Sequence, residues 1–217
     1  MKNIFATLIS ISLLLNCSSN SNRLKYEIQN AIEISVSTEL ELRGEGSVYN
    51  EFMDDIRDDY NPKHIIDIGK SKLIFQPKGT DALEGSAIED VTRILIAHSK
   101  IETNAFPKYD FKFNKSDLDG FNEYFKKVII KELKTLPIEN EIIEWSPSKM
   151  GIINGLSYVK TSYISTVKGE KSYSETYQFF NTNEQVIIAN STDYSNKNKW
   201  IDIFDDVVKT FDFKSRK

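Results

Sequence analysis

The chain has 217 residues, of which 40% are hydrophobic and 28% are charged, the proportions of an ordinary globular domain. Its net charge of −4, with acidic and basic residues interspersed, argues against nucleic acid as a partner, because that role requires a basic face. The single cysteine excludes an intramolecular disulfide and a cysteine-based zinc site.

Residues 1–16 have the layout of a secretory signal peptide. A positive start, Met1 to Asn3, precedes an apolar stretch from Ile4 to Leu15 that is shorter than the roughly 20 residues of a transmembrane helix. The segment Leu14-Leu15-Asn16-Cys17 resembles the lipobox of bacterial lipoproteins, in which Leu lies three residues before the lipidated Cys. The resemblance implies that residues 1–16 are removed and that Cys17 carries the lipid anchor, including palmitate.

The residues after Cys17 predict a flexible tether, because 18–22 contain only Ser and Asn. We therefore expect residues 17–23 to connect the lipidated Cys to a single α+β domain over 24–217. The expected location is the bacterial cell envelope, with attachment to a membrane through lipid alone. Ser18 and Ser19, in place of an Asp retention signal, favour the outer membrane.

The first half of the domain is predicted to contain short strands. Period-2 alternation or β-prone composition marks Tyr26 to Ile28, Ile32 to Val36, Leu40 to Leu42, Lys72 to Gln76 and Val91 to Ala97. The acidic segment from Tyr49 to Tyr60 has a weak helical pattern.

A long amphipathic helix is predicted from Ser116, which is a suitable N-cap, to Leu136, since Pro137 ends the pattern. Asp117 and Asp119 complement the helix dipole in its first turn. An apolar stripe along one side is wide enough to lie on a sheet, and the lysines lie on the opposite side. The stripe consists of Leu118, Phe121, Phe125, Val128, Ile129, Leu133 and Leu136.

The last third of the chain predicts an antiparallel meander followed by a closing helix. Its strands are expected at Glu141 to Trp145, Gly155 to Lys168, Ser172 to Asn181 and Gln185 to Asp193. The helix starts near Lys197 and places Trp200, Phe204, Val207, Val208 and Phe211 on one face. Strands that are grouped along the chain indicate an α+β fold, with a largely antiparallel sheet between amphipathic helices.

Several of these segments resemble PsbP-like domains. The resemblance rests on Ile153 to Leu156, Tyr177 to Phe180, Val186 to Ala189 and Trp200 to Phe213, with a looser fit at Val36 to Leu42 and Arg93 to Ile96. It implies an αβα sandwich and the role of an accessory binding protein. It transfers no functional residue.

Catalytic signatures are scarce in this sequence. It contains two histidines, His64 and His98, which we interpret as residues without catalytic duty, and it lacks the nucleophile-elbow, zincin and phosphate-loop motifs. Asp117-Leu118-Asp119-Gly120 does not match a calcium loop, because Lys115 and Lys126 occupy ligand positions. We therefore expect a protein that is not an enzyme and needs no cofactor.

Two other candidate sites are weighed against simpler interpretations. Asp54, Asp55, Asp58 and Asp59 could hold Ca²⁺, although such clusters are more often solvated faces. Aromatic residues on the predicted strands could line a small-molecule cleft, although burial in the core is the favoured interpretation. These residues are Tyr158, Tyr163, Tyr173, Tyr177, Phe179 and Phe180. The leading hypothesis is an envelope lipoprotein that binds an unknown envelope protein. The alternative is a small-ligand or Ca²⁺-binding lipoprotein, and a third, weaker alternative is a hydrolase that uses an Asp/Glu pair without a recognisable motif.

Overall fold

The computed structural model describes residues 23–29, 31–43, 72–80, 92–100, 106–135 and 139–216, and two antiparallel sheets form its framework. The larger sheet has seven strands in the order β3-β4-β5-β9-β8-β7-β6, and the smaller has the order β1-β2-β10. The strands of the larger sheet are β3 (Leu40–Leu42), β4 (Lys72–Pro77), β5 (Arg93–Lys100), β6 (Asn140–Ile153), β7 (Leu156–Val167), β8 (Glu170–Asn181) and β9 (Glu184–Asp193). The remaining elements are β1 (Arg23–Ile28), β2 (Ile32–Ser37), β10 (Asp212–Phe213), the helices α2 (Lys115–Thr135) and α3 (Lys197–Lys209), and the 3-10 turns η2 (Tyr194–Asn196) and η3 (Lys214–Arg216).

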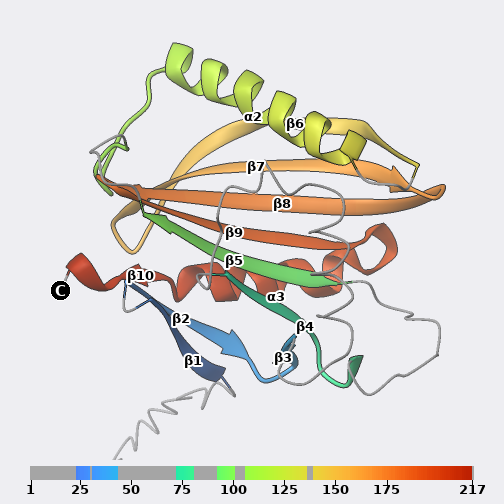
Figure 1. Cartoon of the computed structure of the whole chain (residues 1–217), viewed down its shortest axis with the longest axis horizontal. Helices are drawn as coiled ribbons and strands as arrows, with labels where there is room; N and C mark the ends of the chain where they lie inside the picture. Colours follow the sequence, from blue (N-terminus) through green and yellow to red (C-terminus); the bar gives the residue numbers. More distant parts are fainter. Residues whose placement is uncertain are drawn as a thin grey trace, which may run out of the picture.

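The larger sheet separates two hydrophobic cores. Phe179 and Phe180 are neighbours on β8, so their side chains point to opposite faces of the sheet. Phe179 belongs to the main core, which the sheet shares with α3 and the small sheet. Phe180 belongs to a smaller core with Phe111 and Val159, against which the first turns of α2 pack. This three-layer arrangement confirms the predicted α+β sandwich (Figure 1).

The predicted meander is present and is joined by local turns. Asn154 and Gly155 both have positive φ between β6 and β7, as do Lys168 and Gly169 between β7 and β8, which is the conformation of tight two-residue hairpins. β6 runs to Ile153, well beyond the predicted end at Trp145. It includes Pro147 at one of its two register shifts, as an edge strand tolerates.

The small sheet was not anticipated as a separate unit. Its third strand, β10, follows α3 and pairs with β2 through Asp212 and Phe213. Tyr26 of β1 contacts Phe75 of β4 edge to face, with ring centroids 4.8 Å apart. The first hairpin and the end of the chain therefore close the main core together.

The N-terminus of α2 corrects one detail of the sequence prediction. Ser116 lies inside the helix, and Asn114 caps it instead: the Asp117 amide donates to Asn114 Oδ1 at 2.9 Å, and the Asn114 amide donates back to Asp117 Oδ2. This reciprocal arrangement satisfies two backbone donors at once.

The closing helix α3 lies where the sequence predicts it. Trp200, Phe204, Val207 and Val208 are buried against the main core. Phe211 is also buried, although the helix ends at Lys209 and Phe211 follows the C-cap Thr210. The prediction of one apolar face is therefore confirmed, with its last member supplied by the turn after the helix.

Candidate functional site

The two helices differ in how well they are covered. α3 buries four residues, whereas α2 buries none, although α2 is the longer helix. Of the strands, α2 makes its principal contacts with β6, the edge of the seven-stranded sheet (Figure 1). Its apolar stripe is consequently half-buried rather than enclosed. We call the outer side of this pair of elements the α2–β6 surface, defined by Tyr124, Lys127, Ile130, Lys131, Leu133, Lys134 and Asn140 to Ile143.

A ladder of aromatic rings attaches α2 to the sheet. Phe121 stacks on Phe125 with centroids 5.9 Å apart, Phe125 meets Trp145 of β6 at 6.4 Å, and Trp145 stacks on Tyr163 of β7 at 5.7 Å. Burial raises the pKa of Tyr163, so its hydroxyl stays protonated at neutral pH. The ladder fixes the position of α2 without covering the helix.

A polar contact complements the ladder at the bulge of β6. Asn122 Oδ1 of α2 accepts hydrogen bonds from Trp145 Nε1 and the Ser148 amide, each at 3.0 Å. Ser148 is buried and shares a hydrogen bond with Thr161 of β7. The register shift at Pro147 therefore directs Ser148 and Trp145 to one acceptor.

The C-terminal end of α2 leaves a shallow groove against the start of β6. The groove has a volume of about 190 Å³ and is lined by Ile130, Leu133, Lys134, Asn140, Glu141 and Ile142. Two large apolar side chains of these elements are open to solvent: Ile143, which follows the groove residue Ile142, at 46% exposure, and Tyr124, between one and two turns before Ile130 on α2, at 68%. An apolar groove on the same elements as exposed apolar side chains is a feature of binding surfaces.

A second candidate is a charged cluster between the sheet and α3. Glu175 of β8 is fully buried, and its carboxylate forms an ion pair with Lys160 of β7 and accepts a hydrogen bond from the Tyr173 hydroxyl. Tyr177, two residues along β8, donates to Asp205 of α3 at 3.0 Å. Burial, together with the neighbouring carboxylates, raises the pKa of Tyr173 and of Tyr177. Both phenols therefore remain neutral donors, and the cluster acts as a buried connection between strands and helix.

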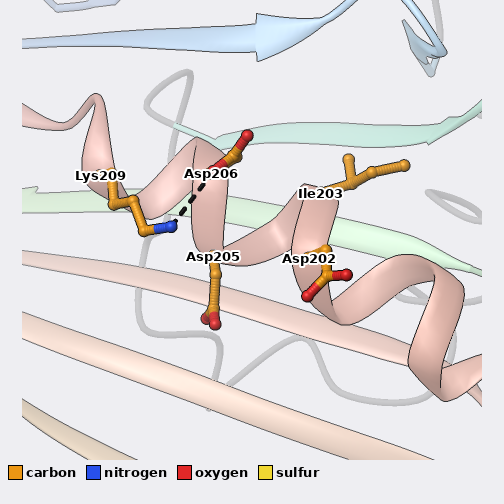
Figure 2. A pocket seen from close by; sticks show the side chains of 5 residues that line it. All are labelled: Asp202, Ile203, Asp205, Asp206 and Lys209. Atoms are coloured by element: carbon orange, nitrogen blue, oxygen red, sulfur yellow. Dashed lines mark hydrogen bonds and ion pairs between the residues drawn. The ribbon is translucent and has the colours of Figure 1, made fainter.

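The outer side of α3 carries a wider, open depression of about 300 Å³, lined by Asp202, Ile203, Asp205, Asp206 and Lys209. Figure 2 shows Asp205 and Asp206 pointing to opposite sides of the helix. Asp206 pairs with Arg23 and Lys209, whereas Asp205 accepts from Tyr177. These carboxylates do not converge, and within the described ranges no three His, Cys, Asp or Glu side chains are grouped to hold a metal ion.

His98 lies at the end of β5, as the sequence indicates, and is buried rather than on the surface. Its Nδ1 donates to Gln29 Oε1 at 3.0 Å, and its Nε2 lies 3.6 Å from Glu184 Oε1. Burial lowers the pKa of His98, against the opposing effect of the Glu184 carboxylate, so the ring is neutral at pH 7. His98 therefore lies between Gln29, in the turn after β1, and Glu184, the first residue of β9.

The predicted aromatic set is divided between the two faces of the sheet, as alternation requires. Tyr173, Tyr177, Phe179 and Phe180 are buried, which confirms the interpretation of these rings as core residues. Tyr158 and Tyr163 are half-buried and pack against the rings of the main core and of the aromatic ladder, respectively.

The remaining predicted site residues lie outside the described ranges: Cys17, His64, Asp54, Asp55, Asp58 and Asp59. Among the residues that are described, no helix has both the length and the apolar character needed to cross a membrane. The sequence analysis did not predict the Glu175–Lys160 pair or the groove. The burial of Glu175 could have been predicted, because Tyr173, Glu175 and Tyr177 alternate along β8 and therefore lie on the same face of the sheet.

The fold and these surfaces define an αβα sandwich with one well-covered and one half-exposed helix. No protein-family model and no curated protein matches the sequence. Among solved structures, the cyanobacterial PsbP protein CyanoP from Synechocystis sp. PCC 6803 is similar, with a TM-score of 0.50 and 12% identity over 89% of this chain and 93% of that one. A protein from Bacteroides thetaiotaomicron VPI-5482 matches with a TM-score of 0.44 and 8% identity over 84% of this chain and 45% of its own length. The chain has a PsbP-like fold, which confirms the resemblance inferred from its strands and closing helix.

Proposed function

We propose that this protein is a lipoprotein of the bacterial cell envelope whose PsbP-like domain is a non-enzymatic binding module for another envelope protein. In this proposal Cys17 supplies the membrane anchor and the α2–β6 surface supplies the contact with the partner. The observation that carries it is the half-exposed state of α2, which buries none of its residues.

The contrast with α3 supports this reading of α2. Exposed apolar area costs free energy in water, about 25 cal/mol per Å², so a helix that serves only the fold is expected to bury its stripe as α3 does. On α2, Tyr124 is 68% exposed, and Ile143 on the adjacent strand is 46% exposed. Large apolar side chains that remain open beside a groove are typical of partner-binding surfaces.

The edge strand β6 is protected against uncontrolled pairing with other strands. Pro147 and the two register shifts interrupt its free edge, which limits the addition of a long strand from another chain. We therefore expect side chains of α2 and the first half of β6, rather than backbone pairing along the whole of β6, to recognise the partner.

The anchor is tested by Cys17→Ala. The variant is expected to lose acylation completely and to accumulate as the unprocessed precursor, because the thiol is the acceptor for lipid. Metabolic labelling with palmitate and intact-mass measurement of the membrane-extracted protein report both changes. Wild-type protein that carries no lipid would contradict the envelope-lipoprotein proposal.

The binding role is tested by photo-crosslinking in cells. A photoreactive amino acid at position 124 or 143 is expected to give a discrete adduct with one protein. The same residue at Asn198, an exposed position on α3, serves as the matched control and is expected to give none. If none of the three positions gives an adduct, or if position 198 gives one of equal strength, the result argues against a partner at the α2–β6 surface.

A further inference from the structure

The α2–β6 surface has a distinct charge. Residues 126–134 of α2 contain four lysines and one glutamate, a net charge of +3 in a chain of net charge −4, so the rest of the chain carries −7. On the α2–β6 surface as defined, Lys127, Lys131 and Lys134 stand against Glu141, which leaves +2. Lys127, Lys131 and Lys134 follow Tyr124 at intervals of three or four residues, so they form one row on the helix. All three lysines are exposed.

This basic row borders the apolar groove directly. Lys134 lines the groove together with Ile130 and Leu133, one turn or less from Lys131, and Glu141 of β6 is the acidic residue of the lining. Opposite charge across an interface steers association and selects among partners, while an apolar pocket favours an inserted apolar side chain. A surface with both features, on a chain that is otherwise acidic, is complementary to an acidic protein surface that presents an apolar side chain.

The position of the basic row relative to the expected anchor favours a protein partner over the host bilayer. Residues 17–22 span at most about 20 Å when fully extended, so the lipid holds the β1 end of the molecule near the membrane. β1 packs on β4, and five strand steps separate β4 from β6, which amounts to about 24 Å. The helix α2 also lies on the face of the sheet opposite to α3 and the small sheet (Figure 1). The basic row is therefore at the end of the molecule remote from the anchor.

We infer that the partner of the α2–β6 surface is an acidic protein, bound through Lys127, Lys131 and Lys134 and through an apolar side chain in the groove. The inference rests on the proposed function and adds the chemistry of the partner and the orientation of the complex. The membrane-distal end of the molecule receives the partner, and the β1 end faces the lipid.

The experiment uses the protein identified by the adduct at position 124, purified and titrated against the full chain extracted from membranes. Lys127→Glu/Lys131→Glu/Lys134→Glu is expected to weaken binding at least tenfold, and the triple Lys→Arg variant is expected to retain it. Binding of the wild type is expected to weaken at least tenfold between about 0.05 and 0.5 M salt, because screening reduces attraction between exposed charges. The matched control is Lys78→Glu/Lys108→Glu/Lys112→Glu, three exposed lysines outside α2, which is expected to have no more than a twofold effect.

Circular dichroism melting of each variant confirms that the fold is retained. The inference is overturned if the Lys127/Lys131/Lys134 glutamate variant still binds the partner, or if the control triple variant weakens binding equally. In both cases the proposed function stands, because the cross-link still places a partner at this surface. Adducts of position 124 with lipid instead of protein also overturn it, since they place the basic row on the bilayer. The absence of any adduct at position 124 or 143 refutes the proposed function itself, so the two failures are distinguishable.

Discussion

Phe204→Ala is expected to lower the free energy of unfolding by about 3 to 5 kcal/mol, the usual range for truncation of a buried aromatic residue. Phe204 is 0% exposed at the centre of α3, and its ring lies 5.6 Å from that of Tyr177, edge to face. Domains of ordinary stability have a total of about 5 to 15 kcal/mol, so the melting midpoint should fall visibly. Urea denaturation followed by circular dichroism measures the change.

Asp202→Ala on the exposed side of the same helix is the matched control, and its effect should stay within about 0.5 kcal/mol. Asp205 is unsuitable as a neutral control, because it accepts the hydrogen bond of the buried Tyr177. If Phe204→Ala leaves stability unchanged and instead removes binding to the cross-linked partner, α3 and not α2 is the recognition helix.

Lys160→Met is expected to destabilise the domain by a similar amount, about 3 to 5 kcal/mol, because it leaves the Glu175 carboxylate buried without its cation. Glu175 is 0% exposed, whereas the Lys160 side chain is 30% exposed. Water can therefore hydrate the lysine but not the carboxylate, which is why removal of the lysine leaves an uncompensated charge. Equilibrium unfolding in urea at neutral pH measures the loss.

The double variant Lys160→Met/Glu175→Leu provides the control for this prediction. Replacing both members of a buried ion pair with apolar residues of similar volume is often close to neutral, so most of the lost stability should return. Tyr173 keeps Ser162 as a side-chain partner in the double variant. A double variant as unstable as the single one would mean that Glu175 contributes through its hydrogen bond with Tyr173 rather than through charge pairing.

Local patterns were sufficient for most of the secondary structure. The periodicity of Trp200, Phe204 and Val207 predicts the buried face of α3 correctly, because a helix repeats its contacts every three to four residues. The turn at Lys168-Gly169 was predictable because Gly169 adopts positive φ without steric cost, and the turn at Thr182-Asn183 because Asn favours turns, although it is the β-branched Thr182 that has positive φ. The N-cap of α2 was placed two residues too late, at Ser116 instead of Asn114, because both are good caps and each is followed three residues later by an aspartate.

The candidate sites depended much more on long-range contacts. The pairing of Lys160 with Glu175 requires the register of β7 on β8, which places Ser162 opposite Glu175 and Lys160 one step along the same face. The amphipathic pattern of α2 shows an apolar stripe, as does that of α3, yet only the packing shows that the stripe is half-exposed at the sheet edge.

The sequence alone determined the α+β class, the order of the meander and closing helix, and the PsbP-like resemblance, because these depend on short-range periodicity and turn chemistry. The Cys17 anchor remains a prediction from sequence. Only the tertiary structure decided that the first hairpin pairs with β10 as a separate sheet, that Glu175 is buried beside Lys160, and that α2 lies chiefly along the edge strand β6. Each of these outcomes depends on contacts between segments that are distant in the sequence. Burial, charge pairing and exposure follow from these contacts and not from the local sequence pattern.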